Sequence, residues 1–246
     1  YDPVFTLRRK RVFEFCDELD RRNLHGMIWS IRARTDTVDP EILDRMWKSG
    51  CRRIFYGIES GSPEVRHRVA KRLSTNEEIL EVLRQTKKRG YEVLGFVMIG
   101  NPLETTETVS QTRELIRQSP IDLLQVASLF PLPGTPIYKE IVARSGRDSW
   151  AEHVRNGSPI HPVERLQTNL SDDDIRRLVS ETYAGFYLRP SFAMYALRRT
   201  KDPVQLRRGL AAAKGISQSF VRGLIKGNPT QQVSTPGGSL LSAALR

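Results

Sequence analysis

The fold is decided by the stretch Ile54-Phe55-Tyr56-Gly57-Ile58-Glu59-Ser60-Gly61-Ser62. Its first half is apolar, with aromatic and β-branched residues, which is typical of a buried strand. The strand then ends in an acid, a hydroxyl and further glycine and serine. Polar groups placed after a buried strand cost free energy unless they bind something. Binding sites of strand-and-helix barrels form at this end of the strands, so we expect a site after Ile58.

The same order of strand and then helix repeats along the first part of the chain. Four strands are predicted, at residues 25–31, 53–58, 91–99 and 122–129, with the stub of one more at residues 1–5. Between them the spacing of apolar residues and the capping residues predict helices over residues 7–23, 39–50, 75–90 and 105–118, and helix starts at Ser62 and Pro136. Short links between alternating strands and helices predict a parallel sheet with right-handed crossovers.

Seven short motifs occur along the chain in a fixed order. They are Asp2-x-x-Phe5-Thr6, Trp29-Ser30-Ile31-Arg32-Ala33-Arg34-Thr35-Asp36, Lys48-Ser49-Gly50-Cys51, Gly57-Ile58-Glu59-Ser60-Gly61-Ser62, Lys71-Arg72-Leu73-Ser74-Thr75, Gly95 to Pro102, and Phe130 to Pro136. Together they resemble the radical S-adenosylmethionine (radical SAM) enzymes, and within these the branch that often carries a cobalamin-binding domain upstream. The resemblance spans about residues 1 to 200. It implies a partial (β/α)6 TIM-like barrel.

The chain departs from this family in its cysteines. The family holds a [4Fe-4S] cluster with three cysteines spaced C-x3-C-x2-C, placed just before the region where this chain starts. Only Cys16 and Cys51 are present here, 35 positions apart, and iron–sulfur ligation needs several thiolates close together. We expect both to be buried small side chains, predict no metal ligands, and interpret the chain as a fragment that lacks the first strand–helix unit and is inactive as it stands.

The expected organisation has four parts. The partial radical SAM barrel covers residues 1–143, and a polar, loop-rich connector covers 144–170. A helical C-terminal extension follows at 171–226, starting with the capping sequence Ser171-Asp172-Asp173-Asp174 and interrupted at Arg189-Pro190. Residues 227–246 are rich in Gly, Pro, Ser and Gln, which predicts disorder.

Glu59 and Ser60 are the first candidates for contacts with S-adenosylmethionine (SAM), on the strength of the family resemblance. A carboxylate can accept hydrogen bonds from ribose hydroxyls or from an ammonium group, and a serine hydroxyl can serve in either way. The alternative is that Glu59 caps the next helix or pairs with Arg32 or Arg34. These two arginines alternate along their strand and share one face. Arg34 lies nearer the strand end, and its partner is either the carboxylate of SAM or a structural ion pair with Glu59 or Asp36.

The remaining candidates follow the two later strands. Gly95, Val97 and Ile99 alternate along residues 91–99, and the resemblance implies that this segment, up to Asn101, contacts the adenine; ordinary barrel core is the alternative. Leu132 lies in the proline-rich loop Phe130–Pro136, which either closes over the adenine or forms a rigid turn.

Charge is distributed unevenly along the chain. The net charge is +11, and residues 186–246 hold ten of the 39 Lys and Arg residues but only one acid, Asp202. A cationic segment of this kind either contacts nucleic acid or an anionic membrane, or is a solvated helix surface. We prefer the solvated surface and regard nucleic-acid binding as the weaker interpretation. No apolar run approaches the roughly 20 residues that span a bilayer.

The resemblance implies a radical enzyme that cleaves SAM reductively for methyl transfer or other radical chemistry on an unknown substrate. Its cofactors are SAM and the [4Fe-4S] cluster, with cobalamin available through a missing upstream domain, and its electron donor is a ferredoxin or flavodoxin. The alternatives are a catalytically dead remnant and a basic RNA-interacting protein. Two cysteines give no disulfide framework, which favours a reducing cytoplasm.

Overall fold

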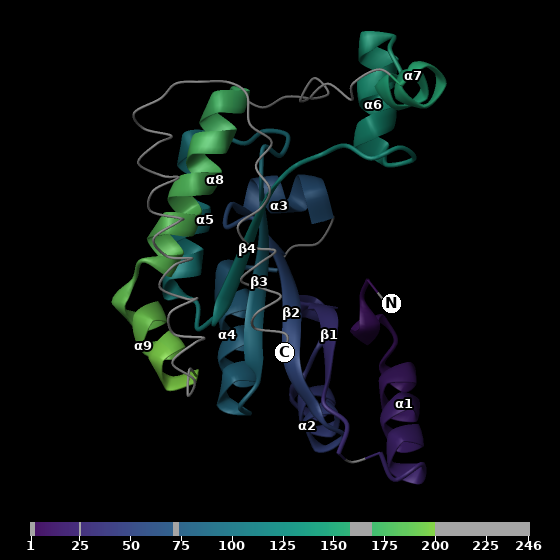
Figure 1. The fold of residues 1–246 in the computed structure, drawn as a ribbon, viewed down its shortest axis with the longest axis vertical. Helices are drawn as coiled ribbons and strands as arrows, with labels where there is room; N and C mark the ends of the chain where they lie inside the picture. The colour runs from purple at the N-terminus through teal and green to yellow at the C-terminus, as the bar shows by residue number, and fades with distance from the viewer. Residues whose placement is uncertain (1–2, 25, 71–73, 158–168, 200–246) are drawn as a thin grey trace.

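The core of the fold is a four-stranded parallel sheet with the order β1-β2-β3-β4 (Figure 1). The computed structural model describes residues 3–24, 26–70, 74–157 and 169–199. The strands are β1 (Trp29–Arg34), β2 (Cys51–Glu59), β3 (Glu92–Ile99) and β4 (Leu123–Ser128). The parallel strand–helix architecture of a partial TIM-like barrel, predicted from the alternation of elements, is therefore confirmed.

The helices of the described residues begin and end largely where the capping residues predict. They are α1 (Arg9–Arg21), α2 (Pro40–Lys48), α3 (Pro63–Ala70), α4 (Asn76–Lys88), α5 (Thr106–Gln118), α6 (Pro136–Ser145), α7 (Ser149–Asn156), α8 (Asp172–Tyr187) and α9 (Pro190–Arg199), with short 3-10 helices η1 (Phe5–Leu7) and η2 (Thr35–Thr37). Asp39 accepts from the N–H of Ile42, and Thr75 forms a capping box with Glu78. Such caps satisfy the free N–H groups of a first helical turn.

Local predictions differ from the structure at three places. The strand predicted at residues 25–31 forms at Trp29–Arg34 instead. The predicted strand stub at residues 1–5 is not a strand in its described part, because Phe5 begins η1. Its ring packs edge-on against Phe15 and Trp29, at centroid distances of 5.3 and 5.7 Å, so this segment packs through an aromatic contact instead of pairing with a strand. The connector at 144–170 is also more regular than expected, since α7 lies within it, with Asp148 as its N-cap.

The two faces of the sheet differ in character. Ile54, Tyr56 and Ile58 of β2 are buried toward the helices, and the Tyr56 hydroxyl lies 2.9 Å from the Thr86 hydroxyl of α4. We call the opposite side the inner face, defined by Arg32, Phe55 and Phe96. There the Phe55 and Phe96 rings stack at 6.0 Å, and the Arg32 guanidinium lies over Phe96 at 5.7 Å.

Helix α8 covers the outer edge of β4. The Tyr183 hydroxyl accepts from the N–H of Val126 at 2.9 Å and donates to its carbonyl at 3.0 Å. One helical turn later, Tyr187 makes the same pair of contacts with Leu124, at 3.1 and 2.7 Å. Exposed edge strands present unpaired backbone groups that invite association. These two tyrosines satisfy part of the edge and fix α8 to the sheet.

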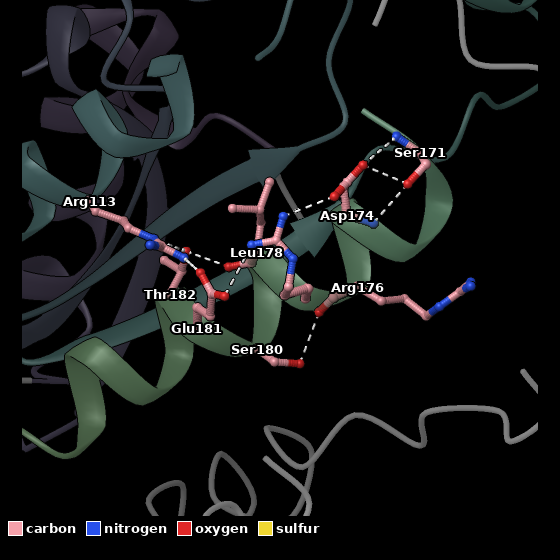
Figure 2. Close-up of polar contacts among 9 residues, drawn as sticks. Arg113, Ser171, Asp174, Arg176, Leu178, Ser180, Glu181 and Thr182 are labelled. Carbon is pink, nitrogen blue, oxygen red and sulfur yellow. Dashed lines mark hydrogen bonds and ion pairs between the residues drawn. The ribbon is translucent and has the colours of Figure 1, made fainter. Parts of the chain in front are cut away.

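Polar contacts join α8 to α5 as well (Figure 2). Arg113 of α5 pairs with Glu181 and donates to the Thr182 hydroxyl at 3.2 Å. At the start of α8, Ser171 and Asp174 form a capping box, as the sequence predicts. The helical extension is thus packed on the sheet at its described end, while the predicted domain boundaries stay a prediction. The predicted helix at 202–226 and the disordered tail at 227–246 lie outside the described residues.

Among the residues that the structure describes, no helix is long and apolar enough to cross a membrane.

Candidate functional site at the carboxyl ends of the strands

The carboxyl ends of β2 and β3 meet at one edge of the sheet, next to α3 (Figure 1). Glu59 ends β2 opposite Val97, and the register between these two strands shifts between Gly57 and Glu59. Irregular pairing at a strand end re-aims the side chains there and is common next to binding sites. The site is described below from Glu59 outward.

Glu59 has an unusual backbone conformation. Its φ is +65°, a region that non-glycine residues rarely adopt. The N–H of Ser60 donates to the carbonyl of Ile58 at 2.8 Å, which closes a three-residue turn around Glu59. A γ-turn with positive φ at its central residue is strained and rare. Strain of this kind persists only where surrounding contacts enforce it, and it concentrates at functional sites. We call Ile58–Ser60 the Glu59 turn.

The Glu59 carboxylate folds back over Gly57 on the inner face. A Cβ at Gly57 would lie 2.5 Å from Oε1 of Glu59, so only glycine leaves room for this carboxylate. Burial raises the pKa of Glu59 above its ordinary value of 4.5, and the positive charge of Arg34 opposes this rise. None of the described residues donates a hydrogen bond to the carboxylate. It is therefore a half-buried acceptor without a donor among the described residues.

Arg34 lies on the neighbouring strand, where it pairs with Gly57 in register. Its guanidinium binds Asp36 in a bidentate manner, with both N···O distances at 3.0 Å. The structural ion pair with Asp36, one of the two alternatives for Arg34, is thus present. The positive charge of Arg34 still acts on Glu59 at a distance and favours a lower pKa of that carboxyl group.

Ser60 points away from the inner face and into the protein. Its side chain is fully buried, and its hydroxyl lies 3.2 Å from the Thr112 hydroxyl of α5. The same Thr112 oxygen accepts from the N–H of Gly61 at 2.9 Å. In this arrangement Ser60 holds the strand end against a helix, and its role in cofactor binding stays a prediction.

Asn101 follows β3 at the same edge and is completely buried. Its side-chain N–H donates to the carbonyl of Met98 at 2.9 Å, whereas Oδ1 has no hydrogen-bond partner in the described structure. A buried acceptor without a donor is costly, and each such atom needs an explanation.

Sequence reasoning missed Glu104. This side chain is also completely buried, and its carboxylate accepts from the backbone N–H groups of Gly100 and Asn101. It therefore fixes the loop that presents Asn101. The available signal was an acid four residues after Gly100 and directly before the cap Thr105, because a carboxylate there can satisfy free N–H groups of the loop.

The three predicted residues on β3 lie on the helix-facing side. A Cβ at Gly95 would meet Ile58 and Ile121 at 3.0 and 3.1 Å, and Val97 and Ile99 belong to the hydrophobic core. Phe96, between Gly95 and Val97, is on the inner face. The three predicted residues therefore lie in ordinary core, which was the alternative considered for them. Leu132 is 53% exposed in the loop before α6, and its carbonyl accepts from the Thr135 hydroxyl. Their contacts with adenine stay predictions.

The cysteines do not fit an iron–sulfur cluster. Both are buried free thiols, and burial raises the pKa of Cys51 to about 12 and that of Cys16 above its ordinary value. Metal ligation requires the thiolate. No group of three or more potential metal-ligating side chains occurs among the described residues. We therefore derive no step through a cluster from these residues.

Fold and site together define a partial-barrel domain with a polar binding edge at its strand ends. Residues 3–116 match the radical SAM superfamily. The resemblance seen in the seven motifs is thus confirmed.

Two curated relatives show what kinds of protein share the sequence. An uncharacterised methyltransferase of Pyrococcus horikoshii is 29% identical over 77% of this chain and 40% of its own length. The anaerobic magnesium-protoporphyrin IX monomethyl ester cyclase of Rubrivivax gelatinosus is 23% identical over 82% of this chain and 35% of its own length. The chain therefore spans well under half of the length of these two relatives.

Solved structures share the fold. The radical SAM methyltransferase TsrM of Kitasatospora setae, with cobalamin and a [4Fe-4S] cluster bound, aligns with a TM-score of 0.52 at 21% identity, over 58% of this chain and 30% of its own. The cobalamin-dependent radical SAM enzyme OxsB aligns with a TM-score of 0.52 at 14% identity, over 96% of this chain and 40% of its own. At these identities the likeness concerns the fold.

Proposed function

We propose that the carboxyl ends of β2 and β3 form a SAM-binding edge, in a protein that carries out radical SAM methyl transfer or related radical chemistry. Glu59 accepts hydrogen bonds from the ribose hydroxyls or the ammonium group of SAM, and Asn101 accepts from the adenine amino group. The carrying observation is the Glu59 carboxylate itself: it is half-buried, folded over Gly57, and receives no hydrogen bond from the described residues.

The acceptors at this edge support a ligand with several hydrogen-bond donors and a positive charge. Two acceptors without protein donors, Glu59 and Asn101 Oδ1, lie at the ends of adjacent strands. The stacked Phe55 and Phe96 rings continue the inner face below them. SAM carries ribose hydroxyls, an ammonium group and an adenine amino group, which are donors of the required kind. When bound, SAM supplies the group that is transferred or the radical that starts the reaction.

The remaining cofactors and partners are part of the same proposal. The methyltransferase name of one relative supports methyl transfer and the cyclase name of another supports other radical chemistry, so both stay part of the proposal, with cobalamin as a possible cofactor. The cluster, the cobalamin and the ferredoxin or flavodoxin electron donor belong to the proposed whole protein, since the two cysteines here do not fit a cluster. Buried free thiols agree with a reducing cytoplasm.

Calorimetric titration of the anaerobically purified protein with SAM tests the proposal. Glu59→Gln keeps the shape of the side chain but removes its charge, so we expect SAM binding to weaken by about 1.5–3 kcal/mol, the range for hydrogen bonds to charged groups. Glu64→Gln, in the first turn of α3, is the matched control and leaves affinity unchanged. Equal affinity of wild type and Glu59→Gln, or no binding by wild type, contradicts the proposal.

The RNA-binding alternative receives no support from the described part of the basic segment. Arg189, its first basic residue, donates to the carbonyl of Ile121 at 2.9 Å and lies over the Phe186 ring at 3.8 Å. It stabilises the packing of the fold and is not an exposed phosphate-binding group. The catalytically dead remnant is the outcome if wild type fails to bind SAM.

A further inference from the structure

Arg66 is a buried charged residue that the proposed SAM contacts do not use. It lies on α3 with 5% of its surface exposed. One terminal nitrogen, NH1, donates to the carbonyl of Ser60 at 2.6 Å and to Oδ1 of Asn76 at 3.0 Å. The other, NH2, donates to the carbonyl of Ser74 at 2.6 Å. Burying a guanidinium is expensive and requires that its donors be satisfied. Here its partners are two backbone carbonyls and an amide, with no carboxylate among them.

These contacts converge on the residues directly after Glu59. Asn76 donates back to the carbonyl of Gly61 at 2.9 Å, so Arg66 and Asn76 together hold two consecutive carbonyls. From the other side, Thr112 of α5 accepts from the N–H of Gly61. The backbone at residues 60 and 61 is therefore fixed by α3, α4 and α5 at once.

The Glu59 turn needs such support. A positive φ at a non-glycine residue is unfavourable and persists only where other contacts enforce it. The fixed Ser60–Gly61 backbone provides that enforcement, because it determines the direction in which the chain leaves β2. Without it, we expect Glu59 to relax to an ordinary extended conformation. Its carboxylate would then leave the space over Gly57.

We propose that Arg66 is a positioning residue for SAM binding: through the Ser60 carbonyl it holds the Glu59 turn, which places the Glu59 carboxylate over Gly57 for the ligand. Asn76 assists by holding the Gly61 carbonyl. Neither side chain contacts the ligand. The inference rests on the proposed function as far as the ligand is SAM, whereas the control of the Glu59 position by Arg66 can be tested without any ligand.

The first experiment follows the Glu59 carboxyl group by ¹³C NMR during a pH titration, with Glu59→Gln identifying the signal. The wild-type group titrates above 4.5, because it is buried and only Arg34, itself paired with Asp36, opposes the effect of burial. In Arg66→Gln and in Asn76→Ala the carboxylate becomes exposed, so its midpoint falls toward 4.5. Loss of the Arg66 charge alone would raise the Glu59 midpoint, which is the opposite of the expected fall. Asn76→Ala changes no charge at all. Both variants therefore distinguish a displaced carboxylate from a change in nearby charge.

Two further variants calibrate this shift. Gly57→Ala displaces the carboxylate directly and should lower the midpoint in the same way. Arg68→Gln removes a neighbouring arginine of α3 that pairs with Glu140, and should leave the midpoint unchanged. An unchanged Glu59 midpoint in folded Arg66→Gln or Asn76→Ala overturns the inference.

The second experiment is a double-mutant cycle in SAM affinity. Arg66→Gln should weaken SAM binding roughly tenfold in the wild-type background and have no further effect in the Glu59→Gln background, because the two residues act as one unit. Additive effects of the two changes overturn the positioning role. If Glu59→Gln alone leaves SAM affinity unchanged, the proposed function fails, while the NMR titration still decides whether Arg66 positions Glu59.

Discussion

The two ends of the sheet use buried polar groups in opposite ways. At the amino end, Glu92 of β3 pairs with Arg53 and accepts from the Tyr195 hydroxyl of α9. Nearby, Asp122 accepts from Lys87 at 2.6 Å and from the N–H of Val93 at 2.8 Å. At the carboxyl end, the Glu59 carboxylate and Asn101 Oδ1 have no donor among the described residues. The acceptors at the amino end are satisfied by the protein, whereas these two acceptors at the carboxyl end have no donor among the described residues.

Backbone strain follows the same division. Three non-glycine residues with positive φ occur in the described structure, and two of them, Glu59 and Leu103, follow or end strands at the carboxyl edge. In strand–helix barrels that edge carries function and the opposite edge carries stability. The comparison predicts that changes at the amino end lower stability most, while changes at the carboxyl end alter stability less or even increase it.

The largest effect is expected at the amino end, from Glu92→Ala. The side chains of Arg53 and Glu92 are only 14% and 7% exposed. Removing one partner of a buried ion pair typically costs about 3–5 kcal/mol. The free energy of unfolding, measured by urea denaturation, should fall by an amount in this range. A loss below about 1 kcal/mol, the value typical of exposed pairs, would show that the amino end is not the more stabilising one.

The next effect concerns the packing of the carboxyl end on α5. A Cβ at Gly61 would lie 2.5 Å from the backbone carbonyl oxygen of Gln111 and from Cα of Thr112. Gly61→Ala must therefore shift α5, and overpacking of this kind costs about 1–3 kcal/mol.

Gly185→Ala is the matched control in the same denaturation experiment. A Cβ there meets nothing within 4 Å, and the residue lies inside α8. We expect it to raise the free energy of unfolding by about 0.5–1 kcal/mol, the helix preference of Ala over Gly. Equal effects of the two substitutions would contradict the close approach at Gly61.

A smaller effect concerns the pH dependence that Glu59 adds. Its pKa is raised in the folded protein, so it binds a proton more tightly when folded, and stability is lost as pH rises from 4.5 through the raised pKa. Each unit of elevation corresponds to about 1.4 kcal/mol. Glu59→Gln should lack this pH-dependent contribution to the free energy of unfolding, whereas the contributions of the other titratable groups stay the same. Denaturation curves between pH 4 and 7.5 measure the difference, and parallel pH profiles of the two proteins would contradict the burial of Glu59.

The smallest effect is expected at Leu103, whose φ is +66° and whose side chain is 38% exposed. Glycine adopts this conformation without steric cost. Leu103→Gly should therefore raise the free energy of unfolding by roughly 0.5–1 kcal/mol, which is measured as a higher melting temperature. Asn23→Gly is the control, because asparagine tolerates its φ of +54° better than leucine does. A stabilisation at Asn23 as large as that at Leu103 would indicate that Leu103 is not strained.

Much of the fold follows from local sequence. The caps Asp39, Thr75, Thr105 and Ser171 begin helices where the sequence predicts them, because a capping side chain bonds the N–H groups of its own first turn. The position of Glu59 at the end of a buried strand was equally predictable, since the apolar run and its polar end are adjacent in sequence. The three β3 residues show the limit, because alternation does not say which side of a strand faces the helices.

Tertiary structure alone decided how the strand ends are held. Ser60 meets Thr112, 52 residues away, and Arg66 meets the Ser60 carbonyl only because α3 packs beside β2. Tyr183 and Tyr187 reach the edge of β4 from more than 50 residues along the chain. Local propensity and caps depend on neighbours in sequence, so the sequence by itself determined the strands, the helices and the polar strand end. Buried hydrogen bonds depend on which distant backbone groups lack partners after packing, and only the folded chain determines that.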